Sequence, residues 1–376
     1  MAKLGDIATY INGYAFKPQD WSDEGIPIIR IQDLTGNSYQ ANRYNGEYAS
    51  KYEVTDGDVL ISWSASLGVY IWHGEKAVLN QHIFKVVFDK ERISKDFFVH
   101  QVGLILENAA SDAHGATMKH LTKPVFDALP FYLPPYEKQC EIAEVLDKVT
   151  SLISLRKQQL AKLDELVKAR FVEMFGDTKL NPNNFPCCSL SEYIVFLTSG
   201  SRGWSQYFTD SGEYFITIKN VKNCKITLQD VQYVTPPDNA EAKRTRVQEN
   251  DLLISITADL GRTGIVTKKI AEHGAYINQH LTCIRLKQDK LNPLYVAYYM
   301  ESDAGKEQFV AKNQSAVKAG LNFNAINSLR LMVPPLALQN QFAAFVERVD
   351  QQKQTVQQSL EKLKLMKKAL MQEYFG

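Results

Sequence analysis

The chain has 376 residues, of which 45% are hydrophobic and 23% charged, which is ordinary globular usage with room for two or three domains. No stretch approaches the roughly 18 apolar residues of a membrane span, and the N-terminus lacks a signal-peptide core, so we expect a cytoplasmic protein with no membrane partner. The net charge of +1 excludes a globally basic nucleic-acid-binding protein, so any DNA contact must come from local patches. Five cysteines without a C-x-x-C pair indicate neither a disulfide framework nor a metal site.

The first part of the chain consists of short β-branched and aromatic segments bounded by Gly, Asn and Asp. Residues 25–31 and 57–62 are typical strands, and Asn80-Gln81-His82 follows them. A helix is expected around residues 95–107. The pattern predicts a mixed α/β or β-rich module.

A long helix is predicted after Leu133-Pro134-Pro135-Tyr136, because proline is tolerated in the first turn of a helix. Apolar residues then recur at alternating steps of four and three, with two arginines among them, which is a heptad seam. The seam consists of Ile142, Leu146, Val149, Ile153, Arg156, Leu160, Leu163, Val167, Arg170 and Met174. We expect a helix from near Pro135 to Gly176, about 60 Å long at roughly 1.5 Å per residue.

A polar, turn-forming segment, Asn181-Pro182-Asn183-Asn184, follows and marks a boundary. Strand-like runs return over residues 212–218 and 250–255, with Asn278-Gln279-His280 after them and a helix expected over 293–313. A second heptad seam then begins after Pro334-Pro335 and ends near Gly376. Its members are Phe342, Val346, Val349, Lys353, Val356, Leu360, Leu363, Lys367, Leu370 and Tyr374.

The second half repeats the first, which indicates a duplicated domain rather than a short-period solenoid. Identical residues recur 200 positions apart within the two predicted helices and at their ends. Examples are Pro134 and Pro334, Gln139 and Gln339, Ala143 and Ala343, Phe175 and Phe375, and Gly176 and Gly376. Each helix either packs on its own half only, or the two pack on each other, antiparallel, about a pseudo-two-fold axis. We favour the second arrangement. The predicted fold class is therefore α+β, with two similar mixed α/β domains separated by two long helices that form an antiparallel coiled coil.

Sequence motifs of enzymes are missing: we find no Walker A loop, no H-E-x-x-H, no G-x-S-x-G and no G-x-G-x-x-G. Leu133-Pro134-Pro135-Tyr136 superficially looks like the Asn/Asp-Pro-Pro-Tyr/Phe motif of amino-methyltransferases. In that motif the first side chain hydrogen-bonds the target amino group, which leucine cannot do. We interpret this segment as a helix start.

The order of these features resembles the specificity subunit of type I restriction-modification enzymes. In each half a Leu-Gly-Asp-type opening precedes a Gly-Asp-Val-Leu-Ile-Ser-type strand, an Asn-Gln-His and then a Pro-Pro, after Leu133 or Val333, ahead of the long helix. The junction Met174-Phe175-Gly176-Asp177, followed by Asn181-Pro182, is also similar to the boundary between the halves in that family. Unlike many members of that family, the sequence is expected to open directly on the first recognition domain.

The resemblance implies a non-catalytic DNA-recognition subunit. It divides the chain into target recognition domain 1 (1–134), spacer helix 1 (135–176), a linker (177–187), target recognition domain 2 (188–334) and spacer helix 2 (335–376). The partners that the resemblance implies for this chain are double-stranded DNA, two modification (methyltransferase) subunits and restriction (nuclease and translocase) subunits. No cofactor is expected on this chain, because S-adenosylmethionine, ATP and Mg would be bound by the partners.

Base reading would fall to polar and aromatic side chains on exposed loops. In the first domain the candidates are Tyr14, Lys17, Arg30, Trp63, Ser64, Lys119 and His120. In the second domain they are Ser201, Arg202, Trp204, Lys219, Asn220, Thr257, Arg262 and Lys318. Lys119 and Lys318 occupy matching places and are either phosphate clamps or solvated lysines. The two Asn-Gln-His segments are interpreted as supports of the fold, because modules that read different bases need not share reading residues.

Two other classes of protein stay open at this stage. A self-contained DNA methyltransferase or nuclease is disfavoured by the lack of a cofactor-binding glycine loop. A coiled-coil adaptor that never touches DNA is compatible with duplication and heptads, and is opposed only by loop residues such as Arg202 and Trp204.

Overall fold

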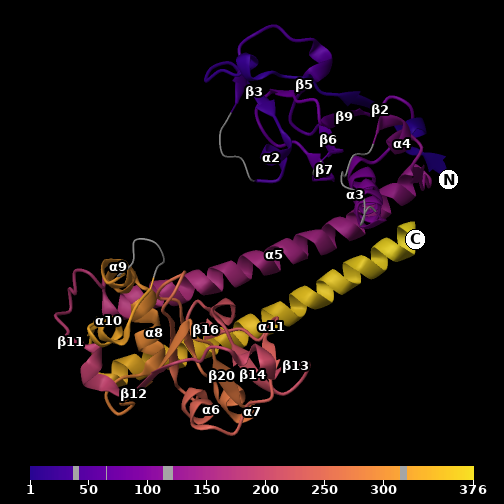
Figure 1. Ribbon diagram of the computed structural model, residues 1–376. Helices are drawn as coiled ribbons and strands as arrows, with labels where there is room; N and C mark the ends of the chain where they lie inside the picture. Colours follow the sequence, from indigo (N-terminus) through magenta and orange to yellow (C-terminus); the bar gives the residue numbers. More distant parts are fainter. Residues whose placement is uncertain (37–41, 65, 113–121, 314–319) are drawn as a thin grey trace. The chain divides into compact units, whose positions relative to one another are not determined.

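The computed structural model describes residues 1–36, 42–64, 66–112, 122–313 and 320–376 (Figure 1). The chain forms two compact units. Unit 1 contains Met1–Gln158 and Gln357–Gly376, and unit 2 contains Gln159–Val356. No helix in the described ranges has both the length and the apolar character needed to cross a bilayer.

The described residues of unit 1 form two four-stranded sheets and a small two-stranded one. The first sheet is antiparallel with the order β2-β9-β6-β7, the second has the order β4-β3-β8-β5, and β1 pairs with β10. In the second sheet β3 and β8 run parallel. The strands are β1 (Ala2–Lys3), β2 (Thr9–Asn12), β3 (Ile26–Ile29), β4 (Arg43–Tyr44), β5 (Glu53–Val54), β6 (Val59–Ser62), β7 (Gly68–Ile71), β8 (Ala77–Leu79), β9 (Ile83–Val87) and β10 (Pro130–Phe131).

Unit 2 repeats this plan. Its antiparallel sheet has the order β12-β21-β18-β19, its second sheet β13-β17-β14-β20 again contains a parallel pair, β14 with β20, and β11 pairs with β22. The strands are β11 (Cys187–Ser189), β12 (Ile194–Ser199), β13 (Phe208–Thr209), β14 (Glu213–Ile216), β15 (Val221–Lys222), β16 (Lys225–Ile226), β17 (Gln232–Val234), β18 (Leu252–Ser255), β19 (Thr263–Ile265), β20 (Ala275–Ile277), β21 (Leu281–Leu286) and β22 (Arg330–Met332). The shared topology confirms the duplicated fold that the sequence predicted.

Shorter helices flank the sheets of both units. Those of unit 1 are α1 (Leu4–Ile7), α2 (Ile31–Leu34), α3 (Lys95–Asp112) and α4 (Lys123–Asp127). Those of unit 2 are α6 (Ala240–Thr245), α7 (Lys268–His273), α8 (Pro293–Glu301), α9 (Asp303–Ala311) and α10 (Phe323–Asn327). The single helix expected over 293–313 is thus two helices. The chain breaks at Ser302, whose backbone is extended (ψ 170°) and whose hydroxyl accepts from Gly305 N at the start of α9.

The two long helices, α5 (Tyr136–Phe175) and α11 (Leu336–Phe375), each have 40 residues and begin directly after the Pro-Pro segments (Figure 1). They run antiparallel. In unit 1 Arg156 Nε donates to Ser359 Oγ (3.2 Å), and in unit 2 Lys353 pairs with Asp164. The predicted seam positions are buried or half-buried along both helices. The antiparallel coiled coil is therefore confirmed, with polar pairs where the seam carries Arg156 and Lys353.

The C-terminal end of each long helix fills a hydrophobic core. Phe175 is fully buried in unit 2, with ring centroids 4.7 Å from Tyr295 and 5.6 Å from Phe342. In unit 1 the ring of Phe375 lies 5.4 Å from that of Phe97. A buried phenylalanine stabilises a fold by roughly 1.5 to 3 kcal/mol through its area alone. The duplicated phenylalanines thus anchor each helix at its far end.

The repeated glutamines anchor the helices at their beginnings. Gln139 is buried, its Nε2 donates to the Pro134 carbonyl (2.9 Å), and its Oε1 accepts from Ser94 N (3.0 Å). Gln339 makes the same two bonds, to the Pro334 carbonyl (2.7 Å) and from Asn292 N (2.8 Å). Each glutamine therefore joins the first turn of a long helix to the start of the nearest domain helix, α3 or α8.

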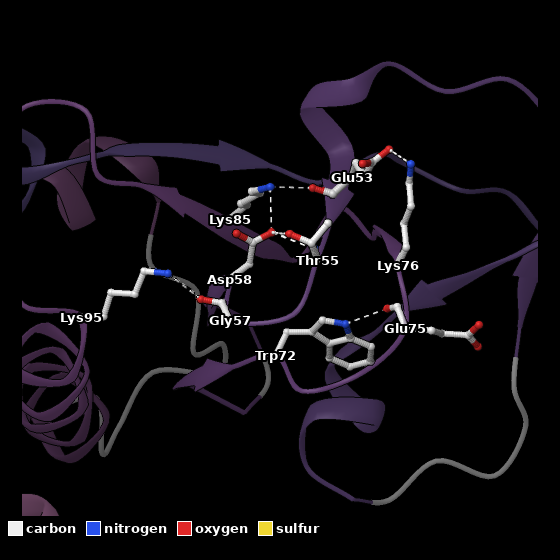
Figure 2. Close-up of polar contacts among 9 residues, drawn as sticks. All are labelled: Glu53, Thr55, Gly57, Asp58, Trp72, Glu75, Lys76, Lys85 and Lys95. Carbon is white, nitrogen blue, oxygen red and sulfur yellow. Dashed lines mark hydrogen bonds and ion pairs between the residues drawn. The ribbon is translucent and has the colours of Figure 1, made fainter.

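The repeated aspartates Asp58 and Asp251 hold the start of the central strand in each antiparallel sheet. Asp58 accepts from Thr55 N (2.8 Å) and pairs with Lys85 Nζ (2.9 Å), which also donates to the Glu53 carbonyl (Figure 2). Burial raises the pKa of Asp58, but hydrogen bonds from Lys85 and Thr55 outweigh that effect and lower it below its ordinary value. Asp251 is fully buried and forms a bidentate salt bridge with the Arg285 guanidinium.

Candidate nucleic-acid interface

The two Asn-Gln-His segments form matching β-turns at one end of each antiparallel sheet. In unit 1 Ile83 N donates to the Asn80 carbonyl (3.2 Å), and in unit 2 Leu281 N donates to the Asn278 carbonyl (3.1 Å). These bonds place Gln and His at the two central positions of the turn, where their side chains are half-buried. We call these segments the Gln-His turns (80–82 and 278–280).

A glycine fixes each Gln-His turn through close backbone approach. A Cβ added at Gly13 would lie 2.1 Å from the Asn80 carbonyl oxygen, and one at Gly200 would lie 2.1 Å from that of Asn278. Contacts that short are impossible, so the close approach requires glycine. The asparagine side chains accept within the turn, from Gln81 N (2.6 Å) and from His280 N (3.2 Å) respectively. The expected supporting role thus describes the asparagines.

Four candidates of the first domain gather around the unit 1 turn, because β2 and β6 end beside the start of β9 and β3 ends beside Asn80. Tyr14 is 41% exposed, and its backbone forms an isolated β-bridge with Asn80. Arg30 follows β3, and its guanidinium lies 5.6 Å from the centre of the Trp21 ring. Trp63 N donates to the His82 carbonyl (3.4 Å), and its ring Nε1 donates to Asn12 Oδ1 (3.2 Å). Ser64 is buried.

Two candidates of the second domain, Ser201 and Thr257, contact the unit 2 turn, while Lys219 follows β14 and Arg262 precedes β19. Ser201 bridges to Asn278, and its buried hydroxyl has no hydrogen-bond partner among the described residues. Lys219 is exposed in the short 3-10 helix after β14. Thr257 Oγ1 lies 2.6 Å from His280 Nδ1. Arg262 directly precedes β19, is half-buried and forms an ion pair with Asp259.

The remaining candidates lie elsewhere. Trp204 (3% exposed) stacks on Phe215 at 5.4 Å, and Asn220 (2% exposed) donates to the Thr227 carbonyl (3.2 Å). Both side chains are engaged in contacts within unit 2, with Phe215 and with the Thr227 carbonyl, and we assign them a structural role. Lys17 and Arg202 are exposed on the loops that follow β2 and β12. Lys119, His120 and Lys318 lie outside the described residues.

Sequence reasoning left out the central residues of the turns and one arginine. Gln81, His82, Gln279 and His280 lie among the candidates, and their repetition was the signal that could have included them. Arg244, on α6, donates to the Ser199 carbonyl (2.9 Å) at the end of β12, which no local pattern indicates.

The arrangement offers hydrogen-bond donors, hydroxyls and aromatic faces at one end of each sheet. These groups contact base edges, phosphates and sugars in protein–DNA complexes. No group of three or more His, Cys, Asp or Glu side chains within the described ranges is placed to hold a metal ion. Each unit thus presents, at the same end of its antiparallel sheet, a similar set of polar side chains around a Gln-His turn.

Comparison with known proteins gives the family. Residues 1–165 and 205–365 match the type I restriction modification DNA specificity domain, and the chain belongs to this family. The EcoBI type I specificity subunit of Escherichia coli is 23% identical over 374 residues, spanning 92% of this chain and 78% of that one. The MjaVIII specificity subunit of Methanocaldococcus jannaschii is 20% identical over 393 residues, spanning 99% and 90%.

Solved structures share the fold. The S subunit of a type I restriction-modification system from M. genitalium has a TM-score of 0.59 at 13% identity, with 100% of this chain and 95% of that chain covered. A chain solved to explain complex assembly and conformational transition of the type I R-M system has a TM-score of 0.58 at 16% identity, with 100% and 96% covered. The expected fold class is confirmed.

Proposed function

We propose that this chain reads a bipartite double-stranded DNA target, with the Gln-His end of each unit contacting one half-site. As a member of the specificity family it is a DNA-recognition subunit without a catalytic site of its own. The observation that carries the proposal is the duplicated sheet end, whose framework is the same in both units while neighbouring side chains differ. Tyr14 and Ser64 in unit 1 correspond to Ser201 and Thr257 in unit 2.

The domain assignment follows the elements. We propose target recognition domains at 1–134 and 188–334, spacer helices at 135–176 and 335–376, and a linker at 177–187. The starts of α5 at Tyr136 and α11 at Leu336, directly after the two Pro-Pro segments, support these divisions. The side chains proposed to read bases or contact phosphate are Tyr14, Lys17, Arg30, Trp63 and Ser64 with Ser201, Arg202, Lys219, Thr257 and Arg262.

Specificity subunits act together with modification and restriction subunits, and we propose two modification subunits for this chain, one for each half of the repeat. The outer faces of the long helices support this proposal, because they expose apolar side chains that the coiled coil does not use. These are Val145, Leu152, Leu155, Leu166 and Val172 on α5, and Leu365 and Met366 on α11. S-adenosylmethionine, ATP and Mg would be bound by the partner subunits.

Salt-dependent binding to a defined site tests the proposal. The complex with the cognate modification subunit should bind one duplex far more tightly than unrelated DNA, and log K should fall linearly with log salt as phosphate counterions are released. The methylated motif in DNA from cells that carry both subunits identifies that duplex. Tight assembly with the modification subunit but no site-specific binding would favour a structural adaptor. Methylation by the chain alone would favour a self-contained enzyme.

A further inference from the structure

The two Gln-His turns carry the same side chains, Gln and His, at the same positions. Base reading does not explain this identity, because the two domains read different half-sites. The turns match in backbone, in the glycine that clamps them and in their pairing to the central strand. Trp63 N donates to the His82 carbonyl, and Ile256 N donates to that of His280 (3.0 Å). Two equivalent neighbours differ in chemistry, since Ser201 replaces Tyr14 and Ile256 replaces Trp63, whereas Gln81 and Gln279 are identical.

The fold itself uses the asparagines and the backbone of the turns. Gln81 receives its turn bond through its backbone N, and its side-chain amide has no hydrogen-bond partner among the described residues. In unit 2 Gln279 Nε2 donates to His280 Nε2 (3.1 Å). A ring nitrogen that accepts leaves the other to carry the proton, so His280 Nδ1–H donates to Thr257 Oγ1 (2.6 Å). Thr257 and His280 therefore orient the Gln279 amide.

We propose that Gln81 and Gln279 each donate a hydrogen bond to the sugar–phosphate backbone of one half-site. The inference rests on the proposed function. What two different half-sites have in common is the phosphate backbone, and contacts to it fix the register of a domain on the duplex without reading sequence. A primary amide carries two N–H groups, so Gln279 keeps one for a phosphate oxygen after bonding His280. The differing neighbours are then placed against the bases.

The test uses Gln279→Glu in the complex with the modification subunit. Glutamate has nearly the same size, Thr257 can exchange donor and acceptor roles with His280, and the new charge is repelled by phosphate. Hydrogen bonds to charged groups are the stronger ones, so affinity should fall about tenfold or more. The loss should be equal for the cognate duplex and for a duplex without the site, and the methylated motif should stay unchanged.

Gln288→Glu is the matched control. It makes the same chemical change just beyond the opposite end of β21, where Gln288 accepts from Asn250 Nδ2 (3.2 Å), a bond that glutamate retains. Its affinity for both duplexes should equal that of the unchanged chain. Gln81→Glu should reproduce the tenfold loss from the other unit, and thermal melting of each variant separates a folding defect from a binding defect.

A duplex series with single uncharged methylphosphonates locates the contact. One position in each half-site should weaken binding of the unchanged chain, and at that position Gln279→Glu or Gln81→Glu should weaken it no further. Unchanged affinity of both glutamate variants, or a motif relaxed at one base pair, would overturn the backbone contact while leaving the proposed function standing. Failure of the unchanged complex to discriminate the cognate duplex would contradict the proposed function itself.

Discussion

Replacing Gln339 with leucine tests how a long helix is joined to its recognition domain. The side chain is fully buried, with one bond to the Pro334 carbonyl and one from Asn292 N, besides a longer bond to the Lys290 carbonyl (3.4 Å). Leucine fills much of the space but leaves both backbone groups buried and unpaired. Each such group costs about 1 to 3 kcal/mol, so the free energy of unfolding of unit 2 should fall by roughly 2 to 6 kcal/mol.

Urea denaturation followed by circular dichroism measures this loss, with Gln352→Leu as the control on the exposed face of the same helix. The control should change the unfolding free energy by no more than about 0.5 kcal/mol. Gln139→Leu should cause a similar loss in unit 1, since its two bonds are equivalent. A loss below about 1 kcal/mol for Gln339→Leu, or equal effects of Gln339→Leu and Gln352→Leu, would refute the reasoning.

Three further predictions concern activity, spacing and pH. The purified chain should neither methylate nor cleave DNA with S-adenosylmethionine, ATP and Mg supplied, and turnover that is lost on changing Tyr136 would contradict this. Adding four residues to both long helices, near Lys157 and Gln358, lengthens each by about 6 Å at roughly 1.5 Å per residue. Because four residues are close to one turn, the seam survives, and sequencing of methylated sites should find the gap wider by one or two base pairs; an unchanged gap in an active enzyme would show that spacing is set elsewhere. Since the pKa of Asp58 is lowered in the folded chain, its pairing stabilises the fold above the ordinary Asp pKa of about 3.9 and is lost as the pH falls through the lower folded value. The stability difference between the unchanged chain and Asp58→Asn should therefore shrink below about pH 4 in acid titrations, and a difference that grows there would contradict the assignment.

The sequence predicted the parts of the fold that repeat with a fixed period. The heptad seams and the proline starts gave both long helices, because a/d burial and helix-start chemistry are local properties. The break at Ser302 was missed, since a capping serine inside a helical stretch is recognisable only when the next helix changes direction. The repetition of Gln139 as Gln339 is visible in the sequence, but Ser94 and Asn292, which donate to these side chains, are distant in sequence, so the hydrogen bonds could not be predicted.

The sequence predicted which candidate residues follow strand ends and therefore lie together. It did not predict which of the candidate side chains are buried. Tyr14, Trp63 and Thr257 follow strands, and the antiparallel sheets bring such positions to one end. Trp204 sits among glycines and polar residues, which indicates a loop, yet its ring packs on Phe215 in the interior. Composition around an aromatic residue does not reveal which way its ring faces.

Exchange of one recognition domain tests the central claim most directly. Residues 188–333 would be replaced with the corresponding domain of a relative, and the methylated motif would be sequenced from cells that carry the hybrid with the modification subunit. One half of the bipartite motif should change to that of the relative, while the other half stays as it was. A change in both halves, or in neither, would contradict the assignment of one half-site to each unit.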